Sequence, residues 1–209
     1  MTRRTFEMLP GFRVLPGYFD RAAQESLLEE IRAVVQAAPL FLPRMPKTGK
    51  PFSVRMSNCG SLGWVSDPNG YRYQPTHPVT GEPWPPMPQS LANAWRDICP
   101  GAPEPEACLI NFYSPDARMG LHQDRDEETF DAPVLSVSLG ATAVFRIGGL
   151  NRRDPTRSIR LASGDAVVLG GAARLAHHGV DRIIKGTSEL VKDDGRINLT
   201  LRRVTPPKG

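Results

Sequence analysis

The sequence has few cysteines and no long apolar run. Three cysteines occur among 209 residues, and none belongs to a Cys-x-x-Cys pair, so neither a disulfide framework nor a zinc knuckle is expected. No stretch approaches the ~20 apolar residues of a membrane span, and no apolar run of signal-peptide length follows the N-terminal arginines. Internal repeats and low-complexity tracts are also lacking. These absences predict a soluble, cytoplasmic protein.

The charge balance of the chain excludes few classes of function. The chain has 26 Lys and Arg against 22 Asp and Glu, a net charge of +4 and a pI near 9.2. This balance favours contact with phosphates, but it is also common in proteins that never bind nucleic acid. The length suits one domain with a real core, so residues 1–209 are expected to form a single domain. Nothing in the sequence signals an interface, so a monomer is the default expectation.

Two helices and a series of short strands are predicted. Asp20 is a suitable N-cap for a helix over 20–38, and apolar spacing predicts a second helix over 90–98. From about Ala107, β-type runs alternate with turns. The predicted strands are 108–113, 134–139, 143–147, 159–161, 166–169 and 197–204. Such a series favours a jelly roll over residues 107–204, and hence a mainly β fold with flanking helices.

Residues 42–88, between the two helices, are dense in Pro, Gly and aromatic residues. A long segment with little periodicity is typical of a functional lid or binding loop, and its aromatic content argues against disorder. Trp64, Tyr71 and Tyr73 within it could bind a ligand or could pack inside the lid. Trp84 and Trp95 are predicted to be core residues.

The histidines form a pattern of metal ligands. His122 and Asp124 flank Gln123, and in an extended segment residues two apart point the same way, so both can reach one metal ion. His178 would complete the set from a distant strand, with His177 as an alternative. Two imidazoles and one carboxylate hold one face of non-haem Fe(II) in oxygenases. Zn, Mn, Co and Ni accept the same donors, but the co-substrate site described next favours Fe(II).

An arginine-bearing strand accompanies these ligands. Arg196, Asn198 and Arg202 fall at i, i+2 and i+6 and so project from one face of a strand; Asn111 and Tyr113 share this period on another strand. Guanidinium groups bind carboxylates in bidentate fashion. The set suits a small dicarboxylate whose other end chelates iron, which indicates an Fe(II)- and 2-oxoglutarate-dependent oxygenase. The alternative is that the two arginines form salt bridges on a solvated face.

The sequence resembles the AlkB family of nucleic-acid dealkylases, specifically its bacterial type, over nearly the whole chain. The matching stretches are Asn58-Cys59-Gly60, Leu62-Gly63-Trp64, 86–90, 107–111, Leu121-His122-Gln123-Asp124, Asp126-Glu127, 136–140, Gly148-Gly149-Leu150 and the Arg-x-Asn-x-Thr-x-Arg run at 196–202. The resemblance implies a double-stranded β-helix, another name for this jelly roll, preceded by a nucleotide-recognition lid. It also implies direct-reversal DNA repair, in which 1-methyladenine and 3-methylcytosine are oxidatively demethylated with release of formaldehyde, succinate and CO2.

The resemblance further assigns site residues by position. The implied iron ligands are His122, Asp124 and His178. The implied 2-oxoglutarate ligands are Asn111, Tyr113, Arg196, Asn198 and Arg202, with Arg196 chosen for the distal carboxylate. The implied substrate contacts are Trp64, Tyr71, Arg72, Tyr73, Asp126 and Arg152, with Trp64 stacked on a flipped base opposite His122.

Several alternatives stay open at the level of sequence. The substrate of such an oxygenase could be a protein or a small molecule instead of nucleic acid. A metal-stabilised nucleic-acid-binding module without turnover is a second alternative, although pure binding needs neither the metal ligands nor the arginine strand. For a dealkylase, single- or double-stranded DNA and RNA all remain candidate partners, and the order of preference among lesions is open.

Overall fold

Antiparallel pairing builds two main sheets in this computed structural model, which describes residues 6–7 and 9–207. The larger sheet runs, from edge to edge, through β1 (Phe6–Glu7), β2 (Phe12–Leu15), β11 (Ala166–Leu169), β8 (Val134–Gly140), β13 (Arg196–Arg202), β6 (Ala107–Tyr113) and β3 (Arg55–Gly60). The smaller sheet contains β10 (Arg157–Leu161), β9 (Thr142–Ile147), β12 (His178–Ile184) and β7 (Met119–His122). A separate hairpin is formed by β4 (Gly63–Asp67) and β5 (Gly70–Gln74).

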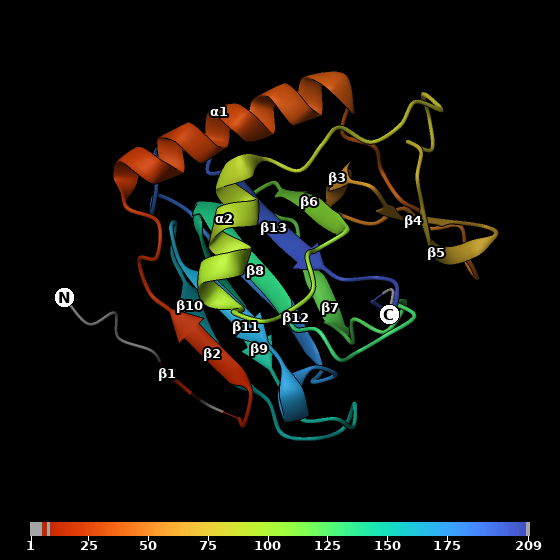
Figure 1. The fold of residues 1–209 in the computed structure, drawn as a ribbon. Coiled ribbons are helices and arrows are strands. Elements are labelled where there is room, and N and C mark those ends of the chain that lie inside the picture. Colours follow the sequence, from red (N-terminus) through yellow and green to blue (C-terminus); the bar gives the residue numbers. More distant parts are fainter. Residues whose placement is uncertain (1–5, 8, 208–209) are drawn as a thin grey trace.

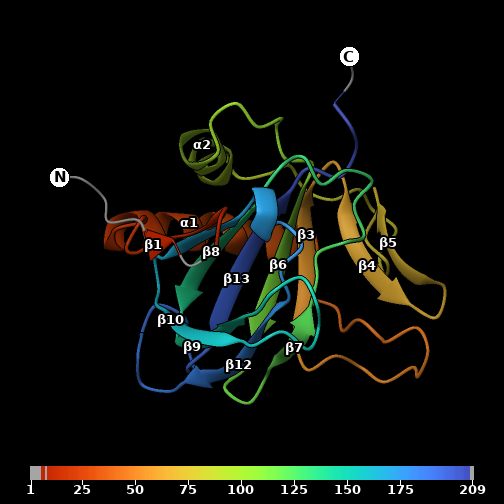
Figure 2. The same ribbon diagram turned by 90° about the horizontal axis from the view of Figure 1, so that it is seen from below.

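The larger sheet is apolar on one face and carries functional groups on the other. Along β13, Ile197, Leu199 and Leu201 pack into the cluster beneath the helices. The alternate residues of β13 face the smaller sheet, because successive side chains of a strand point to opposite faces. Figures 1 and 2 show the helices on one side of the larger sheet and the smaller sheet on the other. This layering is the jelly roll that the sequence predicts.

Both predicted helices are present. Helix α1 spans Arg21–Ala37, and the carboxylate of Asp20 accepts a hydrogen bond from the Ala23 amide at 2.9 Å. Helix α2 spans Gln89–Ile98 and buries Leu91 and Trp95 against the sheet. Their apolar stripes therefore serve packing, as the spacing indicates.

The sheets use more of the chain than the predicted core of 107–204. Strand β3 lies inside the predicted lid of 42–88, yet it pairs with β6 as the edge of the larger sheet. Strand β2 likewise joins from the N-terminal side by pairing with β11. The part of 42–88 that stands apart from the sheets includes the β4–β5 hairpin, beside the β3 edge in Figure 1. The predicted strands also do not include β7 and β12, although His178 is expected on a strand as a metal ligand, which is where the structure has it.

The remaining expectations concern buried residues. All three cysteines are buried free thiols. Trp84 and Trp95 are 5% and 0% exposed, which confirms their prediction as core residues. Among the described residues, no helix has the length and apolar character needed to cross a membrane.

Candidate active site

Three side chains that could hold a metal ion meet at the β7 edge of the smaller sheet. His122 ends β7 and His178 begins β12, and the two residues lie directly opposite each other in the pairing of these strands. Asp124 follows shortly after, and the ligand atoms of the three side chains lie within 4.8 Å of one another. His177 is not part of this cluster. Strand pairing thus brings together ligands that are far apart in the sequence.

Backbone carbonyls orient both imidazole rings. Nδ1 of His122 lies 2.9 Å from the Gly120 oxygen. Nδ1 of His178 lies 3.0 Å from the Ala176 oxygen. Since a carbonyl oxygen can only accept a hydrogen bond, each Nδ1 carries the proton and each Nε2 keeps its lone pair. The Nε2 atoms lie 3.7 and 3.9 Å from the Asp124 carboxylate, and this donor set would fit a divalent metal ion.

Asp124 is a buried carboxylate that its neighbours keep charged. Its Oδ2 accepts from Nε and Nη2 of Arg202 at 3.1 and 2.9 Å. Burial alone would raise the pKa of this carboxyl, but the charge of Arg202, aided by the two histidines, holds the pKa well below its usual range. Burial, with a smaller effect of His122, lowers the pKa of His178 to about 4. At neutral pH the site offers a carboxylate and a neutral imidazole, the states that bind metals.

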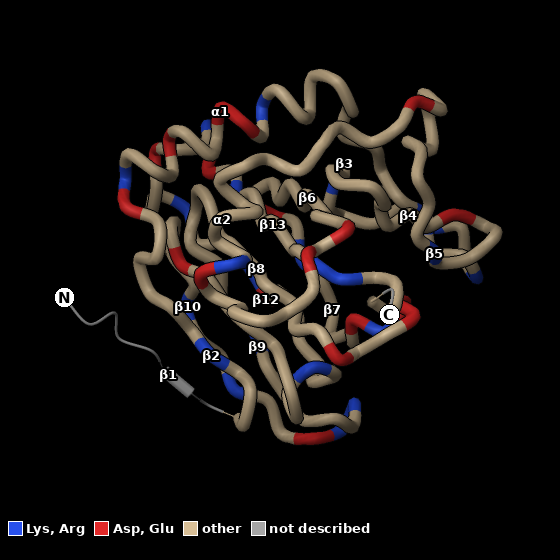
Figure 3. Tube along the Cα trace, viewed as in Figure 1, with Lys and Arg blue, Asp and Glu red and all other residues tan. Residues whose placement is uncertain are grey.

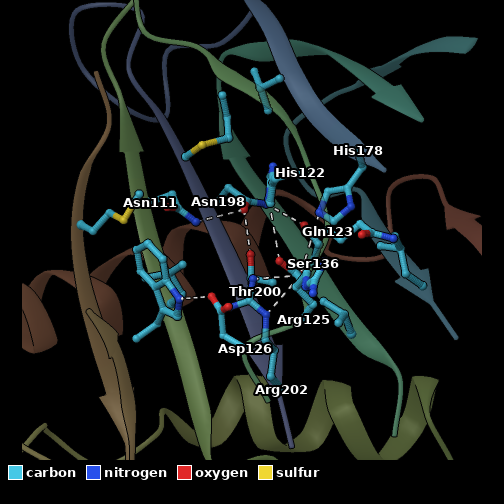
Figure 4. A pocket seen from close by; sticks show the side chains of 18 of the residues that line it. Asn111, His122, Gln123, Arg125, Asp126, Ser136, His178, Asn198, Thr200 and Arg202 are labelled. Carbon is cyan, nitrogen blue, oxygen red and sulfur yellow. Dashed lines mark hydrogen bonds and ion pairs between the residues drawn. The ribbon is translucent and has the colours of Figure 1, made fainter. Parts of the chain in front are cut away.

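Strand β13 faces the same cavity. Asn198 lies directly opposite Asn111 of β6. Arg196 lies opposite Tyr113 of that strand. These four side chains and Arg202 line a cavity of about 450 Å³, and Figure 4 shows Asn198 and Arg202 on it together with Asn111. The structure therefore gathers all five residues that were predicted to bind the dicarboxylate.

Unpaired polar atoms in this cavity, two of them guanidinium donors, mark a place for an anion. Arg196 is 1% exposed, and its two Nη atoms donate to two backbone carbonyls and the Ser138 hydroxyl. Nε of Arg196, Nη1 of Arg202 and Oδ1 of Asn111 have no partner, three of the four such buried side-chain atoms in the described part of the chain. Burial lowers the pKa of Arg196 to about 10, so it is charged at neutral pH. Because buried polar atoms are normally paired, these guanidinium donors fit a dicarboxylate.

The β4–β5 hairpin supplies an aromatic wall of the cavity. Trp64 and Tyr73 face each other across the hairpin, and the ring of Tyr71 stacks on Trp64 with centroids 5.6 Å apart. The Trp64 indole donates to Oδ2 of Asp126 at 2.8 Å. The Tyr73 hydroxyl donates to Oε1 of Glu127 at 2.6 Å. Two acidic residues close to the metal ligands thus anchor the hairpin.

Comparison with known proteins agrees with this geometry. The sequence model of the 2OG-Fe(II) oxygenase superfamily matches residues 11–202. The chain is 57% identical over 205 residues to the "Alpha-ketoglutarate-dependent dioxygenase AlkB homolog" of Caulobacter vibrioides, covering 97% of this chain and 92% of that protein. The chain belongs to the AlkB family. It is therefore an Fe(II)- and 2-oxoglutarate-dependent dioxygenase. The His-Asp-His triad fits Fe(II), and the arginine strand fits 2-oxoglutarate.

Two further comparisons support membership of the AlkB family. The chain is 44% identical over 201 residues to "Alpha-ketoglutarate-dependent dioxygenase AlkB" of Escherichia coli, covering 94% of this chain and 92% of that protein. The solved structure of OsALKBH1 superposes with a TM-score of 0.82 at 29% identity, over 96% of this chain and 100% of that one. The jelly-roll fold is thus shared with this AlkB relative over 96% of the chain.

Most of the residues predicted to bind substrate line the cavity of this AlkB-family protein. They are Trp64, Tyr71, Tyr73, Asp126 and Arg152. Arg72 is not brought there, because alternation along β5 points its side chain away from Tyr71 and Tyr73. Its guanidinium instead donates to both carboxylate oxygens of Asp67, at 3.0 and 2.9 Å. In this structure Arg72 therefore supports the hairpin and does not line the cavity.

Sequence reasoning missed three residues around the metal ligands: Gln123, Glu127 and Arg174. Glu127 is buried between Arg174 at 3.2 Å and Arg202 at 3.4 Å. Arg174 is 3% exposed and also donates to the Asp124 carbonyl at 2.8 Å. Glu127 stands in a recognised motif, but Arg174 lies in a run of small apolar residues with no pattern. Local spacing does not reveal that an arginine is buried.

Acidification is expected to destabilise the metal-free protein between pH 6.5 and about 4. Burial keeps His178 neutral in the folded protein down to a pKa of about 4, whereas the unfolded chain takes up this proton near 6.5. The unfolded state binds more protons in this window. The free energy of unfolding therefore decreases as the pH is lowered, by about 3 kcal/mol from this group. Urea unfolding of chelator-treated protein across the window measures the change. Constant stability there would contradict a neutral, buried His178.

Proposed function

We propose that this protein oxidatively removes N-linked methyl groups from bases of DNA or RNA, with 1-methyladenine and 3-methylcytosine as substrates. One observation carries the proposal: a metal triad, an arginine strand and an aromatic hairpin share one cavity. Its volume of about 450 Å³ is in the range of small-molecule sites and suits a base beside a dicarboxylate. Membership of the AlkB family, known for this chemistry, supports the same reaction.

The two ends of β13 have different tasks in this proposal. His122, Asp124 and His178 would hold Fe(II), which with 2-oxoglutarate and oxygen supplies the oxidation that releases the methyl group as formaldehyde and leaves succinate and CO2. Arg202 contacts the metal-binding carboxylate of Asp124. Arg196, at the opposite end of the strand, therefore takes the distal carboxylate of 2-oxoglutarate, and its buried, anchored guanidinium fixes the orientation of that molecule.

The aromatic hairpin binds the base. A base in a duplex must leave the stack before its ring nitrogens can react, and it is then held by stacking in a pocket. Trp64 stacks on the flipped base from the side opposite His122. Asp126 accepts from the Trp64 indole through one oxygen, so the other can accept from the exocyclic amine of adenine or cytosine. Because stacking tolerates every base, the lesion and not the sequence determines binding.

Surface charge has a smaller role in this proposal. Figure 3 shows Lys and Arg interspersed with Asp and Glu along the trace. Arg152, the predicted strand contact, lines the cavity and donates to the Leu121 carbonyl at 3.2 Å. Arg152 is the only basic residue among the predicted substrate contacts that line the cavity, so we expect a shallow dependence of binding on salt. Affinity then depends chiefly on the base pocket.

The test uses iron-loaded protein, 2-oxoglutarate, oxygen and a single-stranded oligonucleotide with one 1-methyladenine, and the product strand is analysed by mass spectrometry. We expect loss of one methyl mass with matching succinate and formaldehyde, all abolished by Asp124→Ala, and no reaction of the unmethylated strand. Succinate beside an unchanged methylated strand would point to a protein or small-molecule substrate. No succinate from folded, iron-loaded protein would favour a binding module.

Replacing Trp64 by alanine is expected to raise KM for the methylated oligonucleotide about 10-fold or more, because one stacking contact contributes about 1–3 kcal/mol. Trp64→Phe is the matched variant: it keeps an aromatic face and loses only the indole hydrogen bond to Asp126. It should therefore retain most of the affinity. Steady-state kinetics with varied oligonucleotide measures both. Equal KM values for the alanine variant and the unaltered protein would show that Trp64 serves lid packing alone.

A further inference from the structure

The pairing of β7 with β12 ends at His122 and His178. No strand pairing joins the segment that follows His122 to the segment that precedes His178. Residues 123–133 lie outside all strands, so no sheet ladder fixes the position of Asp124. Residues 174–177, just before His178, are likewise outside strands. Arg202 on β13 holds the Asp124 carboxylate from one side. The direct link between Asp124 and the segment before His178 consists of side-chain contacts between these two segments.

Gln123 makes the first of these contacts. It lies at the cavity wall near His122 and His178 (Figure 4). Its amide Nε2 donates to the Leu175 carbonyl at 2.6 Å, which ties the residue between two ligands to the segment that leads into the third. The same amide lies 3.3 Å from the Leu150 carbonyl, on the loop between β9 and β10.

Arg174, in the segment before His178, makes a second contact, which reaches back to the loop that carries Asp124. Its Nη1 donates to the carbonyl of Asp124 at 2.8 Å, and its Nε donates to the carbonyl of Ala132 at 3.0 Å. Its Nη2 pairs with the buried carboxylate of Glu127 at 3.2 Å. One guanidinium thus contacts the loop that carries Asp124 at three places. A planar group with several fixed donors suits this task, and a lysine could not reproduce it.

We propose that Gln123 and Arg174 are positioning residues that hold Asp124 and His178 at metal-binding distance. Each reaches across to the other's segment, so the two hydrogen bonds form a reciprocal clamp. Neither side chain is itself a ligand of the cluster. Partners that orient metal ligands in this way typically change metal affinity by about 10–100-fold when removed.

The test measures binding of Co(II) alone, by its visible absorption, to chelator-treated protein under anaerobic conditions. Gln123→Met removes the amide donor at similar size, and Arg174→Lys keeps the charge but loses the fork. Gln24→Met is the matched control, because the Gln24 amide also donates to a carbonyl, that of Phe19 at 2.8 Å, away from the cavity. Thermal unfolding of each metal-free variant separates loss of stability from loss of metal binding.

We expect Co(II) to bind Gln123→Met and Arg174→Lys about 10-fold or more weakly, while Gln24→Met lowers Tm without changing Co(II) affinity. Folded Gln123→Met with unchanged Co(II) affinity would overturn the clamp, even if Arg174→Lys did not fold. An equal loss of affinity in Gln24→Met would also overturn it, since general destabilisation would then explain the effect. Failure of the unaltered protein to bind Co(II) would instead count against the metal centre itself.

Discussion

Asp124→Ala is expected to abolish metal binding and turnover and also to lower the stability of the metal-free protein. The carboxylate of Asp124 is the closer of two acidic partners of the buried Arg202, at 2.9 Å against 3.4 Å for Glu127. Removing one member of a buried ion pair leaves the other charge poorly compensated, which costs about 3–5 kcal/mol. Urea unfolding of the chelator-treated variant, compared with the unaltered protein, measures this cost.

Asp124→Asn separates the two roles of this side chain. It keeps an oxygen that can accept from Arg202 but lacks the negative charge, so metal binding should be lost while part of the stability returns. If Asp124→Ala unfolded at the same urea concentration as the unaltered protein, Glu127 alone would suffice to compensate Arg202. The buried ion pair would then serve only to orient the metal ligand.

Arg196→Lys is expected to raise KM for 2-oxoglutarate about 10–100-fold, with a much smaller effect on KM for the oligonucleotide. A hydrogen bond to a charged group contributes about 1.5–3 kcal/mol, and a lysine in this place loses the fixed fork that binds a carboxylate. In the unaltered protein, hydrogen bonds to the Ser138 hydroxyl and to two backbone carbonyls orient the Arg196 guanidinium. The lysine variant cannot reproduce this set of bonds. Steady-state kinetics with each substrate varied in turn provides the measurement.

Arg13→Lys is the matched control, because Nη2 of Arg13 donates to the Ile98 carbonyl at 2.8 Å and Arg13 is not part of the cavity lining. Its KM for 2-oxoglutarate should equal that of the unaltered protein. An unchanged KM in Arg196→Lys together with a raised one in Arg202→Lys would transfer the distal carboxylate to Arg202. The assignment of the two ends of β13 would then be reversed.

Local sequence patterns alone predict helix α1, the two faces of strand β13 and the candidate metal and dicarboxylate ligands. The N-cap Asp20 and the apolar spacing after it mark α1 because both depend on residues a few positions apart. Alternation along 196–202 separates the apolar residues Ile197, Leu199 and Leu201 from the functional residues of the strand, since the period of a strand is two. The metal ligands and arginines are recognisable because their chemistry restricts residue type and spacing.

Contacts between segments far apart in the chain determine the features that the sequence did not predict. The direct pairing of His178 with His122, the place of β3 at the sheet edge and the burial of Arg174 each depend on segments far apart in the chain. The direction of Arg72 toward Asp67 likewise depends on which face of a hairpin meets the cavity. Sequence spacing restricts only what lies within a strand or a helix turn. The clamp around the metal ligands follows from contacts that form only when the sheets have closed.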